Sequence, residues 1–368
     1  MHDYLNQRGG AERVFAHIAR AYPDAPVYTA LYDTRATGDL VDPARVHPSA
    51  LQRLPMAGRY FRYLAPLYPR AFEGFDLSGY DAIVSSTTAW AKGVLFPPGA
   101  VHVCYVNTVS RFLFAYDEYV GGLTSLAAPL ARPIVAQLAD WDRRAAMRPT
   151  VLVANSVNVA RRIDRYYGRA STVLHCPVDV DRFSVGPGEG DYFVVVARLL
   201  PYKRVDLAIA GCARAGVPLR VVGTGPAEES LRSAARGTAT TFCGTLSDAE
   251  LNALVGKARA AIVAGEEDFG LVPLEAAAAG RPTIAYGRGG ALETIVPGVT
   301  GEYFDEPTPQ SLAAAIAAFD DRRYDPQALR AHAERFAPQR FIERLRQIVN
   351  ETSATHANRN GMAPPPGA

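Results

Sequence analysis

Short runs of apolar, mostly β-branched residues recur along the chain, and segments with helical periodicity lie between them. Runs of this length bounded by turn residues predict strands, here residues 82–84, 101–106, 151–154, 193–197, 219–222, 261–263 and 283–285. Apolar positions that repeat every three to four residues predict helices, here residues 11–22, 156–167, 204–215, 248–258 and 271–279. Alternating strands and helices predict right-handed βαβ units and parallel sheets, and so an α/β fold class.

The alternation restarts after residues 176–190, CPVDVDRFSVGPGEG, where Pro, Gly and Asp collect. A chain of 368 residues suits two domains at roughly 150 residues each. We therefore expect two Rossmann-like, doubly wound domains that face a cleft, residues 1–177 and 178–350, with two terminal helices in the second. Residues 351–368 are polar and rich in Pro and Gly, and we expect a disordered tail there.

The first glycine pair, Gly9 and Gly10, follows only eight residues. A doubly wound domain opens with a buried strand before its first glycine-rich turn, so the first strand is expected to be truncated. Either the start codon is placed too late or the domain has lost its central strand, and we favour the first explanation.

Charge and composition narrow the function classes. The chain has 39 basic and 37 acidic residues, a net charge of +2, which gives no basis for general nucleic-acid binding. No apolar run approaches the roughly 20 residues of a membrane span, and no signal-peptide core precedes the first helix, so we expect a cytoplasmic protein. The four cysteines have no CxxC spacing, which argues against a zinc site or a disulfide framework.

The charge is uneven. Residues 1–177 hold 19 basic and 14 acidic residues (+5), and residues 178–368 hold 20 and 23 (−3). Only three basic residues are lysines, Lys92, Lys203 and Lys257.

Two segments carry candidate chemistry. In GEEDFGLVPLEAAAAG (265–280) a strand enters a loop, and Gly270 opens a helix whose free N–H groups can bind phosphate or sugar oxygens. Glu267 and Glu275, eight residues apart, could contact different hydroxyls of one sugar nucleotide; alternatively, acids at this helix start only complement its dipole. In VVVARLLPYKRVD (194–206), Arg198 and Lys203 follow a strand and suit a diphosphate, although two exposed cations in a loop are also common.

Glycine turns at 9–10, 223–230 and 287–294 are weak signals individually. No turn matches GxGxxG with its downstream acid, and GxxxxGK[ST] does not occur, so nicotinamide and ATP binding lose support.

Taken together, GGAER, RLLPYK and the E-x7-E element of EEDFGLVPLE resemble glycosyltransferase family 4, the retaining GT-B enzymes, over residues 1–350. The segments HDYL, DLSGYDAIVSSTTAWAKG, YYGR, PVDVDRF and AYGRGGALETI are most similar to bacterial O-antigen and exopolysaccharide mannosyltransferases.

This resemblance implies roles for single residues. Arg198 and Lys203 would neutralise the donor diphosphate, Glu275 would bind the ribose hydroxyls, and Glu267 would bind the transferred sugar. The amides of Phe269, Gly270 and Leu271 would bind the sugar together with Glu267, and the backbone at Gly9 and Gly10 would approach the diphosphate. Thr245 and Leu246 fall where family members contact the base. The family needs no metal or other cofactor, and GDP-mannose is the favoured donor. The DVD at 179–181 is accordingly not expected to bind metal.

One segment departs from the subgroup, which shows His-Thr-Pro-x-Arg-Tyr after a strand of its first domain. Asn107 stands where the histidine is usual and Val109 where proline is usual, whereas Arg111 is retained and is expected on the acceptor side. Asparagine can hydrogen-bond a sugar hydroxyl but cannot carry a proton. We therefore include Asn107, with Glu267, Arg198 and Lys203, among the catalytic candidates.

Residues 53–70, RLPMAGRYFRYLAPLYPR, interleave arginines with aromatic residues in the basic half. This pattern suits attachment to the anionic inner face of the cell membrane, where a polyprenyl-diphosphate-linked acceptor would be located. Aromatic residues at helical spacing are, however, more often core.

The favoured interpretation is a retaining glycosyltransferase that moves a hexose, mannose first, from a nucleotide sugar to a glycan or lipid-linked acceptor in surface polysaccharide synthesis. Two alternatives stay open: an inactive or altered relative that binds donor or partner, and a GT-B sugar-nucleotide epimerase.

Overall fold

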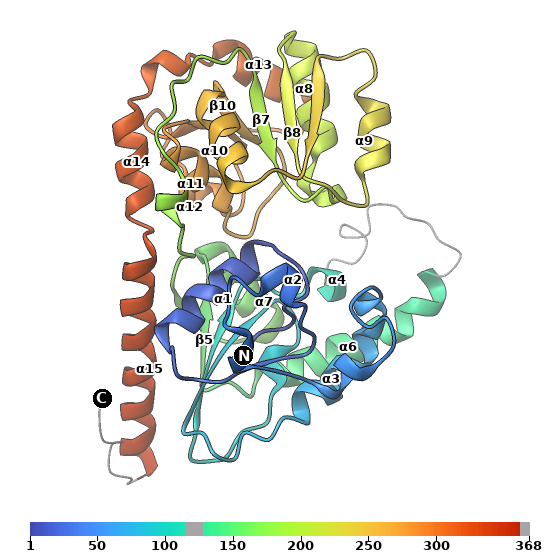
Figure 1. The fold of residues 1–368 in the computed structure, drawn as a ribbon, viewed down its shortest axis with the longest axis vertical. Helices are drawn as coiled ribbons and strands as arrows, with labels where there is room; N and C mark the ends of the chain where they lie inside the picture. The colour runs from blue at the N-terminus through green and yellow to red at the C-terminus, as the bar shows by residue number, and fades with distance from the viewer. Residues whose placement is uncertain (115–127, 361–368) are drawn as a thin grey trace. The chain divides into compact units, whose positions relative to one another are not determined.

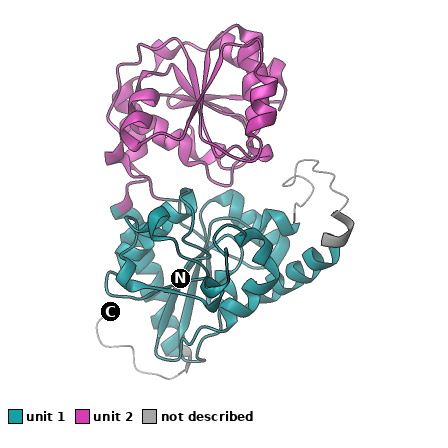
Figure 2. Cartoon of the chain, turned by 45° about the vertical axis from the view of Figure 1, so that its right-hand side comes forward, with its two compact units in different colours: residues 1–117, 122–176, 339–368 teal, residues 118–121, 177–338 magenta. Residues whose placement is uncertain are grey.

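The predicted apolar runs form parallel strands in two separate units (Figures 1 and 2). The computed structural model describes residues 1–114 and 128–360. Of these, unit 1 contains residues 1–114, 128–176 and 339–360, and unit 2 contains residues 177–338. The α/β class and the two Rossmann-like units predicted from the pattern are confirmed.

Unit 2 is a six-stranded sheet in the order β12-β11-β10-β7-β8-β9, with every neighbouring pair parallel. Its strands are β7 (Phe193–Val196), β8 (Leu219–Val222), β9 (Thr240–Gly244), β10 (Ala260–Val263), β11 (Thr283–Tyr286) and β12 (Gly301–Phe304). The order reverses between β7 and β10, and loops at the carboxyl ends of strands flanking such a switch point form ligand sites.

Helices precede, connect and follow these strands. They are η5 (Val180–Arg182), η6 (Pro201–Lys203), α8 (Val205–Ala215), α9 (Glu228–Ala234), α10 (Asp248–Lys257), α11 (Leu271–Ala278), α12 (Ala291–Thr294), α13 (Pro309–Ala318), η7 (Asp321–Arg323) and α14 (Pro326–Glu334). A sheet covered on both faces needs strands that are apolar throughout, and all four residues of β10 are buried.

Unit 1 has a four-stranded parallel sheet, β3-β4-β5-β6, and a parallel pair, β1-β2. Its strands are β1 (Val27–Thr29), β2 (Val46–Pro48), β3 (Ala82–Thr87), β4 (Val101–Val106), β5 (Val151–Ala154) and β6 (Thr172–Val173). The backbone of His2 bridges Thr29 on one side and Ser86 on the other. The first residues of the chain thus occupy the central position between β1 and β3.

The helices of unit 1 are α1 (Gly10–Ala21), α2 (Thr34–Thr37), α3 (Tyr68–Glu73), α4 (Arg111–Phe114), α6 (Ala128–Ala146), α7 (Val157–Tyr167) and α15 (Pro338–Asn360), with short turns η1 (Pro43–Arg45), η2 (Ala50–Arg53), η3 (Phe61–Leu67) and η4 (Ala91–Gly93). None of the helices in the described part of the chain is long and apolar enough to cross a membrane.

The C-terminal helix corrects two expectations. Residues 338–350 were expected to end the second domain, but α15 belongs to unit 1 from Gln339 onward, and there the Arg346 guanidinium donates to the carbonyl of Ala21 at 2.7 Å. Residues 351–360 were expected in a disordered tail, but they continue the same helix. The reason is packing, because Thr352 and Ala357 are buried although the segment is polar in composition. Residues 361–368 lie outside the described residues.

Two buried histidines of unit 1 predict a pH-dependent stability. Burial lowers the pKa of His2 to about 4 and that of His102 to about 3. The unfolded chain takes up protons near the ordinary histidine pKa of 6.5, while the folded chain excludes them. Their contribution to stability is therefore complete above about pH 6.5 and is lost as the pH falls toward 4.

Urea unfolding of the wild type and of His102→Gln between pH 5 and 7.5 measures this effect. We expect the variant to lose less stability than the wild type over that interval. His47→Gln, at an exposed position, is the matched control and should keep the wild-type slope. An equal pH dependence for all three proteins contradicts the assignment.

Candidate donor site and acceptor side

The centre of the predicted donor site is an ion pair in unit 2. Lys203 ends η6, after β7, and Glu267 lies in the loop after β10. The Lys203 ammonium contacts both carboxylate oxygens of Glu267 at 2.6 Å, and each side chain keeps about a fifth of its surface exposed. The sequence predicted both residues for donor binding, and the adjacency of β7 and β10 brings them together although 64 positions separate them.

Two glycines allow this close approach of the loops. A Cβ atom on Gly265 would lie 2.4 Å from the carbonyl oxygen of Tyr202, so any side chain there would push η6 and Lys203 away. A Cβ on Gly290 would lie 2.2 Å from the carbonyl oxygen of Phe269. The Gly290 N–H also donates to the Glu267 carbonyl at 2.9 Å. The glycine turn at 287–294, a weak signal by itself, thus supports the loop that carries Glu267.

The predicted backbone contacts lie where α11 begins. Gly270 has φ 89°, a left-handed conformation that favours glycine, and it precedes α11 without a side-chain cap. The first N–H groups of a helix have no intrahelical acceptor and carry the positive end of its dipole. Phe269 is buried beneath this turn, whereas Gly270 and Leu271 are half-buried. This turn can therefore present donors to sugar or phosphate oxygens.

Glu275 is the fifth of the eight residues of α11 and is about one-fifth exposed. Burial raises its pKa, the nearby Arg182 lowers it, and Asp248 and Asp179 raise it. The Arg182 guanidinium is 3.6 Å from the carboxylate. No pattern in the sequence pointed to Arg182 as a neighbour of Glu275, because the two are 93 positions apart and belong to different elements.

The remaining donor residues of unit 2 lie on loops at the same end of the sheet. Arg198 is exposed and lies two residues after the end of β7. Thr245 and Leu246 form the connection between β9 and α10, Thr245 exposed and Leu246 half-buried. These positions are compatible with diphosphate and base contacts, which remain predictions.

Unit 1 places Gly9 and Gly10 at the start of α1. Gly9 has an extended backbone, and a Cβ there would lie 2.8 Å from a carboxylate oxygen of Glu12. Burial raises the pKa of Glu12 to about 7, while the Gln7 amide, which donates to it at 3.1 Å, acts in the opposite direction. The carboxyl of Glu12 packs against Gly9, and the approach of the backbone at these glycines to the donor diphosphate stays a prediction.

Asn107 follows β4 and is buried. Its amide nitrogen donates to Ser86 Oγ at 2.8 Å and to the Thr87 carbonyl at 3.3 Å, so this nitrogen links the ends of β3 and β4. Arg111 begins α4 four residues later and is half-buried.

A buried network that the sequence did not predict holds the segment between Asn107 and Arg111. Ser110 donates to the Thr88 carbonyl at 3.0 Å and lies 3.4 Å from Asp142. Asp142 forms a fully buried ion pair with Lys92 at 2.5 Å and accepts from the Tyr167 hydroxyl at 2.6 Å. The rarity of lysine in this chain was the one signal that pointed to Lys92.

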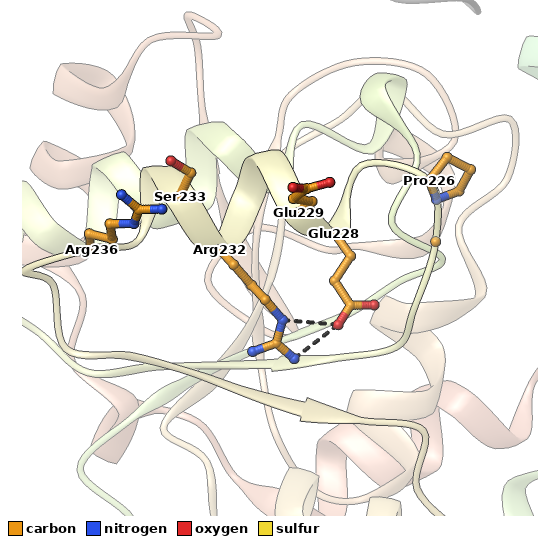
Figure 3. Close-up of a pocket in the computed structure, with 7 residues that line it drawn as sticks. Pro226, Glu228, Glu229, Arg232, Ser233 and Arg236 are labelled. Atoms are coloured by element: carbon orange, nitrogen blue, oxygen red, sulfur yellow. Dashed lines mark hydrogen bonds and ion pairs between the residues drawn. The ribbon is translucent and has the colours of Figure 1, made fainter.

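A shallow groove of about 490 Å³ lies beside α9 and contains none of the predicted donor residues (Figure 3). It is lined by Gly225, Pro226, Glu228, Glu229, Arg232, Ser233 and Arg236. Arg232 is paired with Glu228 at 2.9 Å (Figure 3). Among the described residues no group of three or more His, Cys, Asp or Glu side chains could hold a metal ion. Asp181 of the DVD segment instead contacts Arg330.

Comparison with known proteins agrees with this geometry. The family described as Glycosyltransferase Family 4 matches residues 8–182, and the family described as Glycosyl transferases group 1 matches residues 178–338. The chain is 27% identical to D-inositol 3-phosphate glycosyltransferase of Geodermatophilus obscurus, over 92% of this chain and 83% of that protein. It is also 37% identical to glycogen synthase of Mycobacterium tuberculosis (strain ATCC 25618 / H37Rv), over 45% of this chain and 41% of that protein.

Two solved structures share the fold. Anabaena HepE in complex with UDP-glucose superposes with a TM-score of 0.68 at 18% identity, covering 95% of this chain and 99% of that chain. Sucrose-phosphate synthase from Thermosynechococcus elongatus gives a TM-score of 0.71 at 17% identity over 96% of each chain. Fold and family matches together define a glycosyltransferase of the GT-B type. The chain belongs to glycosyltransferase family 4.

Proposed function

We propose that this enzyme transfers a hexose, with retention of anomeric configuration, from a nucleoside-diphosphate sugar to a hydroxyl of a glycan or lipid-linked acceptor in surface polysaccharide synthesis. The observation that carries the proposal is the Lys203–Glu267 pair beside the start of α11, at the carboxyl ends of β7 and β10. It combines a cation for the diphosphate, a carboxylate for sugar hydroxyls and free helix N–H groups within one loop cluster.

In this reaction the bond between the anomeric carbon and the β-phosphate oxygen breaks, and a bond to the acceptor oxygen forms on the same face. The acceptor proton passes to the departing phosphate, so the enzyme supplies no covalent nucleophile. Negative charge grows on the diphosphate, and Lys203 and Arg198 stabilise it. Preorganised charges of this kind usually make the largest contribution to catalysis.

We propose GDP-mannose as the preferred donor. UDP-glucose is the necessary competitor, because Anabaena HepE, which has a similar fold, was solved in complex with UDP-glucose. The test is incubation with each nucleotide sugar and a lipid-linked or oligosaccharide acceptor, with the anomeric configuration of the product read by NMR. Retention supports the proposal, and inversion contradicts it. A changed sugar nucleotide formed without acceptor would instead favour the epimerase alternative.

Asn107 bears on the alternative that the chain binds donor without turnover. Because its amide nitrogen links the ends of β3 and β4, we expect Asn107→His to give no gain in the rate of transfer. Steady-state transfer by the wild type and the variant checks this, with thermal unfolding as the control for the lost link. A rate increase of tenfold or more would instead support a degraded enzyme in which histidine restores proton transfer.

The basic, aromatic segment 53–70 is proposed as the membrane-facing surface. Its side chains divide between core and solvent: Phe61 and Tyr68 are buried, whereas Tyr63 is 82% exposed. The other exposed apolar members are Leu54, Met56, Tyr60 and Leu67. Arg53, Arg59, Arg62 and Arg70 are exposed along the same segment. Exposed apolar and cationic side chains together are typical of surfaces that bind anionic lipid headgroups.

Co-sedimentation with anionic vesicles tests this surface. Near an anionic membrane each arginine contributes about 1 kcal/mol, so Arg59→Gln with Arg62→Gln should weaken binding by roughly thirtyfold. Arg161→Gln with Arg165→Gln, at exposed positions of α7 in the same unit, is the control with equal charge change. Equal binding of both double variants, or binding indifferent to salt, rejects the electrostatic attachment.

A further inference from the structure

Arg182 lies beside Glu275, the carboxylate that is proposed to hold the donor ribose. Its Nη1 atom is 3.6 Å from Glu275 Oε1. The same guanidinium contacts both oxygens of Asp248 at 2.7 and 3.0 Å. Arg182 belongs to η5, Asp248 to α10 and Glu275 to α11, so one planar group joins three elements of unit 2.

The position of Arg182 is itself fixed by a second arginine. Arg330, on α14, donates to the carbonyls of Val180 at 2.8 Å and of Ala278 at 3.2 Å. Val180 opens the turn that carries Arg182, and Ala278 ends the helix that carries Glu275. Arg330 therefore links η5 to α11 through these two carbonyls. The Arg182 guanidinium, one-fifth exposed, also lies 5.2 Å from the ring centroid of Phe183.

The charges around Glu275 are unbalanced. Burial raises the pKa of this carboxyl, and Asp248 and Asp179 act in the same direction. The Arg182 guanidinium is the group that lowers the pKa of Glu275. On α14, which packs against α11, Arg330 is turned toward backbone carbonyls and toward Asp181 and Glu334. Arg182 is therefore the cation that can keep Glu275 ionised.

We propose that Arg182 is a positioning residue for nucleoside recognition, which keeps Glu275 ionised and oriented so that its two oxygens accept hydrogen bonds from the ribose 2′ and 3′ hydroxyls. This inference rests on the proposed function. An ionised carboxylate can accept both bonds at once, whereas a protonated one offers a donor in place of part of its accepting capacity. Arg182 acts through Glu275 and touches no part of the donor.

The competing explanation is that Arg182 only braces the fold by joining η5 to the first turn of α10. A brace predicts a loss of stability and an affinity loss that does not depend on pH, on the ribose or on Glu275. Positioning predicts dependence on all three. The two explanations therefore separate in nucleotide-binding measurements.

The experiment is isothermal titration calorimetry of the full chain with UDP and GDP from pH 5.5 to 8.5, using whichever nucleotide the wild type binds more tightly. Because a protonated Glu275 loses charge-assisted hydrogen bonds to the ribose, Arg182→Met should weaken binding about tenfold at pH 6, and less at pH 8.5, where the carboxyl ionises more readily. Arg182→Lys should recover part of the affinity. In Glu275→Gln, adding Arg182→Met should change affinity by less than twofold.

The 2′-deoxy nucleotide gives a further readout. The wild type should bind it more weakly than the ribonucleotide, and Arg182→Met should narrow that difference. Arg259→Met is the matched control, because Arg259 pairs with Asp321 at 3.0 Å and directly precedes β10, at the strand end opposite the site. It should leave the affinity and its pH profile unchanged.

Three results decide the matter. A loss in Arg182→Met that is equal at every pH and persists in Glu275→Gln overturns the positioning role and leaves the proposed function intact. Wild-type affinity in both Arg182 variants also overturns it. A wild-type chain that binds neither nucleotide overturns the proposed function together with the inference.

Discussion

Replacing Lys203 with alanine is expected to weaken nucleoside-diphosphate binding at least about a hundredfold while the chain stays folded. The substitution removes the ammonium that would face the diphosphate, and a charge-assisted hydrogen bond of about 1.5–3 kcal/mol goes with it. In the wild type the Lys203 ammonium contacts both oxygens of the Glu267 carboxylate at 2.6 Å, and the substitution removes this cation from beside the carboxylate. Without the Lys203 ammonium beside it, the Glu267 carboxylate would repel the incoming phosphates more strongly, so the loss exceeds that of one contact.

Lys257→Ala is the matched control for Lys203, since Lys257 is an exposed lysine at the end of α10 in the same unit. Calorimetry with UDP and GDP, with thermal unfolding of each variant, gives the comparison. The control should bind like the wild type. Affinities for Lys203→Ala and Lys257→Ala within a factor of three of each other would remove Lys203 from the donor site.

Replacing Asp3 with asparagine is expected to cost about 4 kcal/mol of unfolding free energy. Asp3 is buried, and its carboxylate accepts from the hydroxyls of Thr87 and Thr88 and from four backbone N–H groups of residues 88–91, at 2.6–3.1 Å. Burial acts to raise the pKa of Asp3, but His2 and these donors outweigh it, and the pKa is lowered. An amide cannot accept this many bonds, so buried donors lose their partner.

Asp76→Asn is the control for Asp3. Asp76 is exposed and accepts from the backbone N–H of Ser78 at 3.0 Å, a local turn contact. We expect it to change stability by no more than about 0.5 kcal/mol in urea titration. If Asp3→Asn were no more destabilising than Asp76→Asn, the carboxylate would not organise the segment after β3.

The sequence predicts those parts of the fold where burial is uniform. β4 has the predicted bounds, Val101–Val106, because all six of its residues are buried between neighbouring strands. β9 (Thr240–Gly244) was not predicted, since it lies at the edge of its sheet with no fully buried residue, and a polar pattern carries no strand signal. The bounds of α15 were missed for the opposite reason, because tertiary packing buries a helix face of polar composition.

The residues of the candidate site were likewise only partly predictable from the sequence. Lys203 and Glu267 stand out in sequence because each charge lies in a loop between a predicted strand and a predicted helix, and Glu275 stands out because it follows Glu267 at the E-x7-E spacing. Arg182 and Asp3 do not, since their importance depends on which distant groups they meet. Asp3 interacts with residues 84 to 88 positions away. Asn107 was predicted from a departure in a motif, and the structure adds that its amide nitrogen is engaged within the sheet.

The central claim is that loops of unit 2 bind a nucleoside-diphosphate sugar, and thermal unfolding with a panel of nucleotide sugars tests it most directly. Ligands that bind only the folded state raise its stability by about 2.7 kcal/mol at a hundred times their dissociation constant. We expect one or more of GDP-mannose, UDP-glucose and their nucleotides to raise the melting temperature of the wild type and of Lys257→Ala, but not that of Lys203→Ala. No shift with any nucleotide sugar, or an equal shift in Lys203→Ala, would contradict the account.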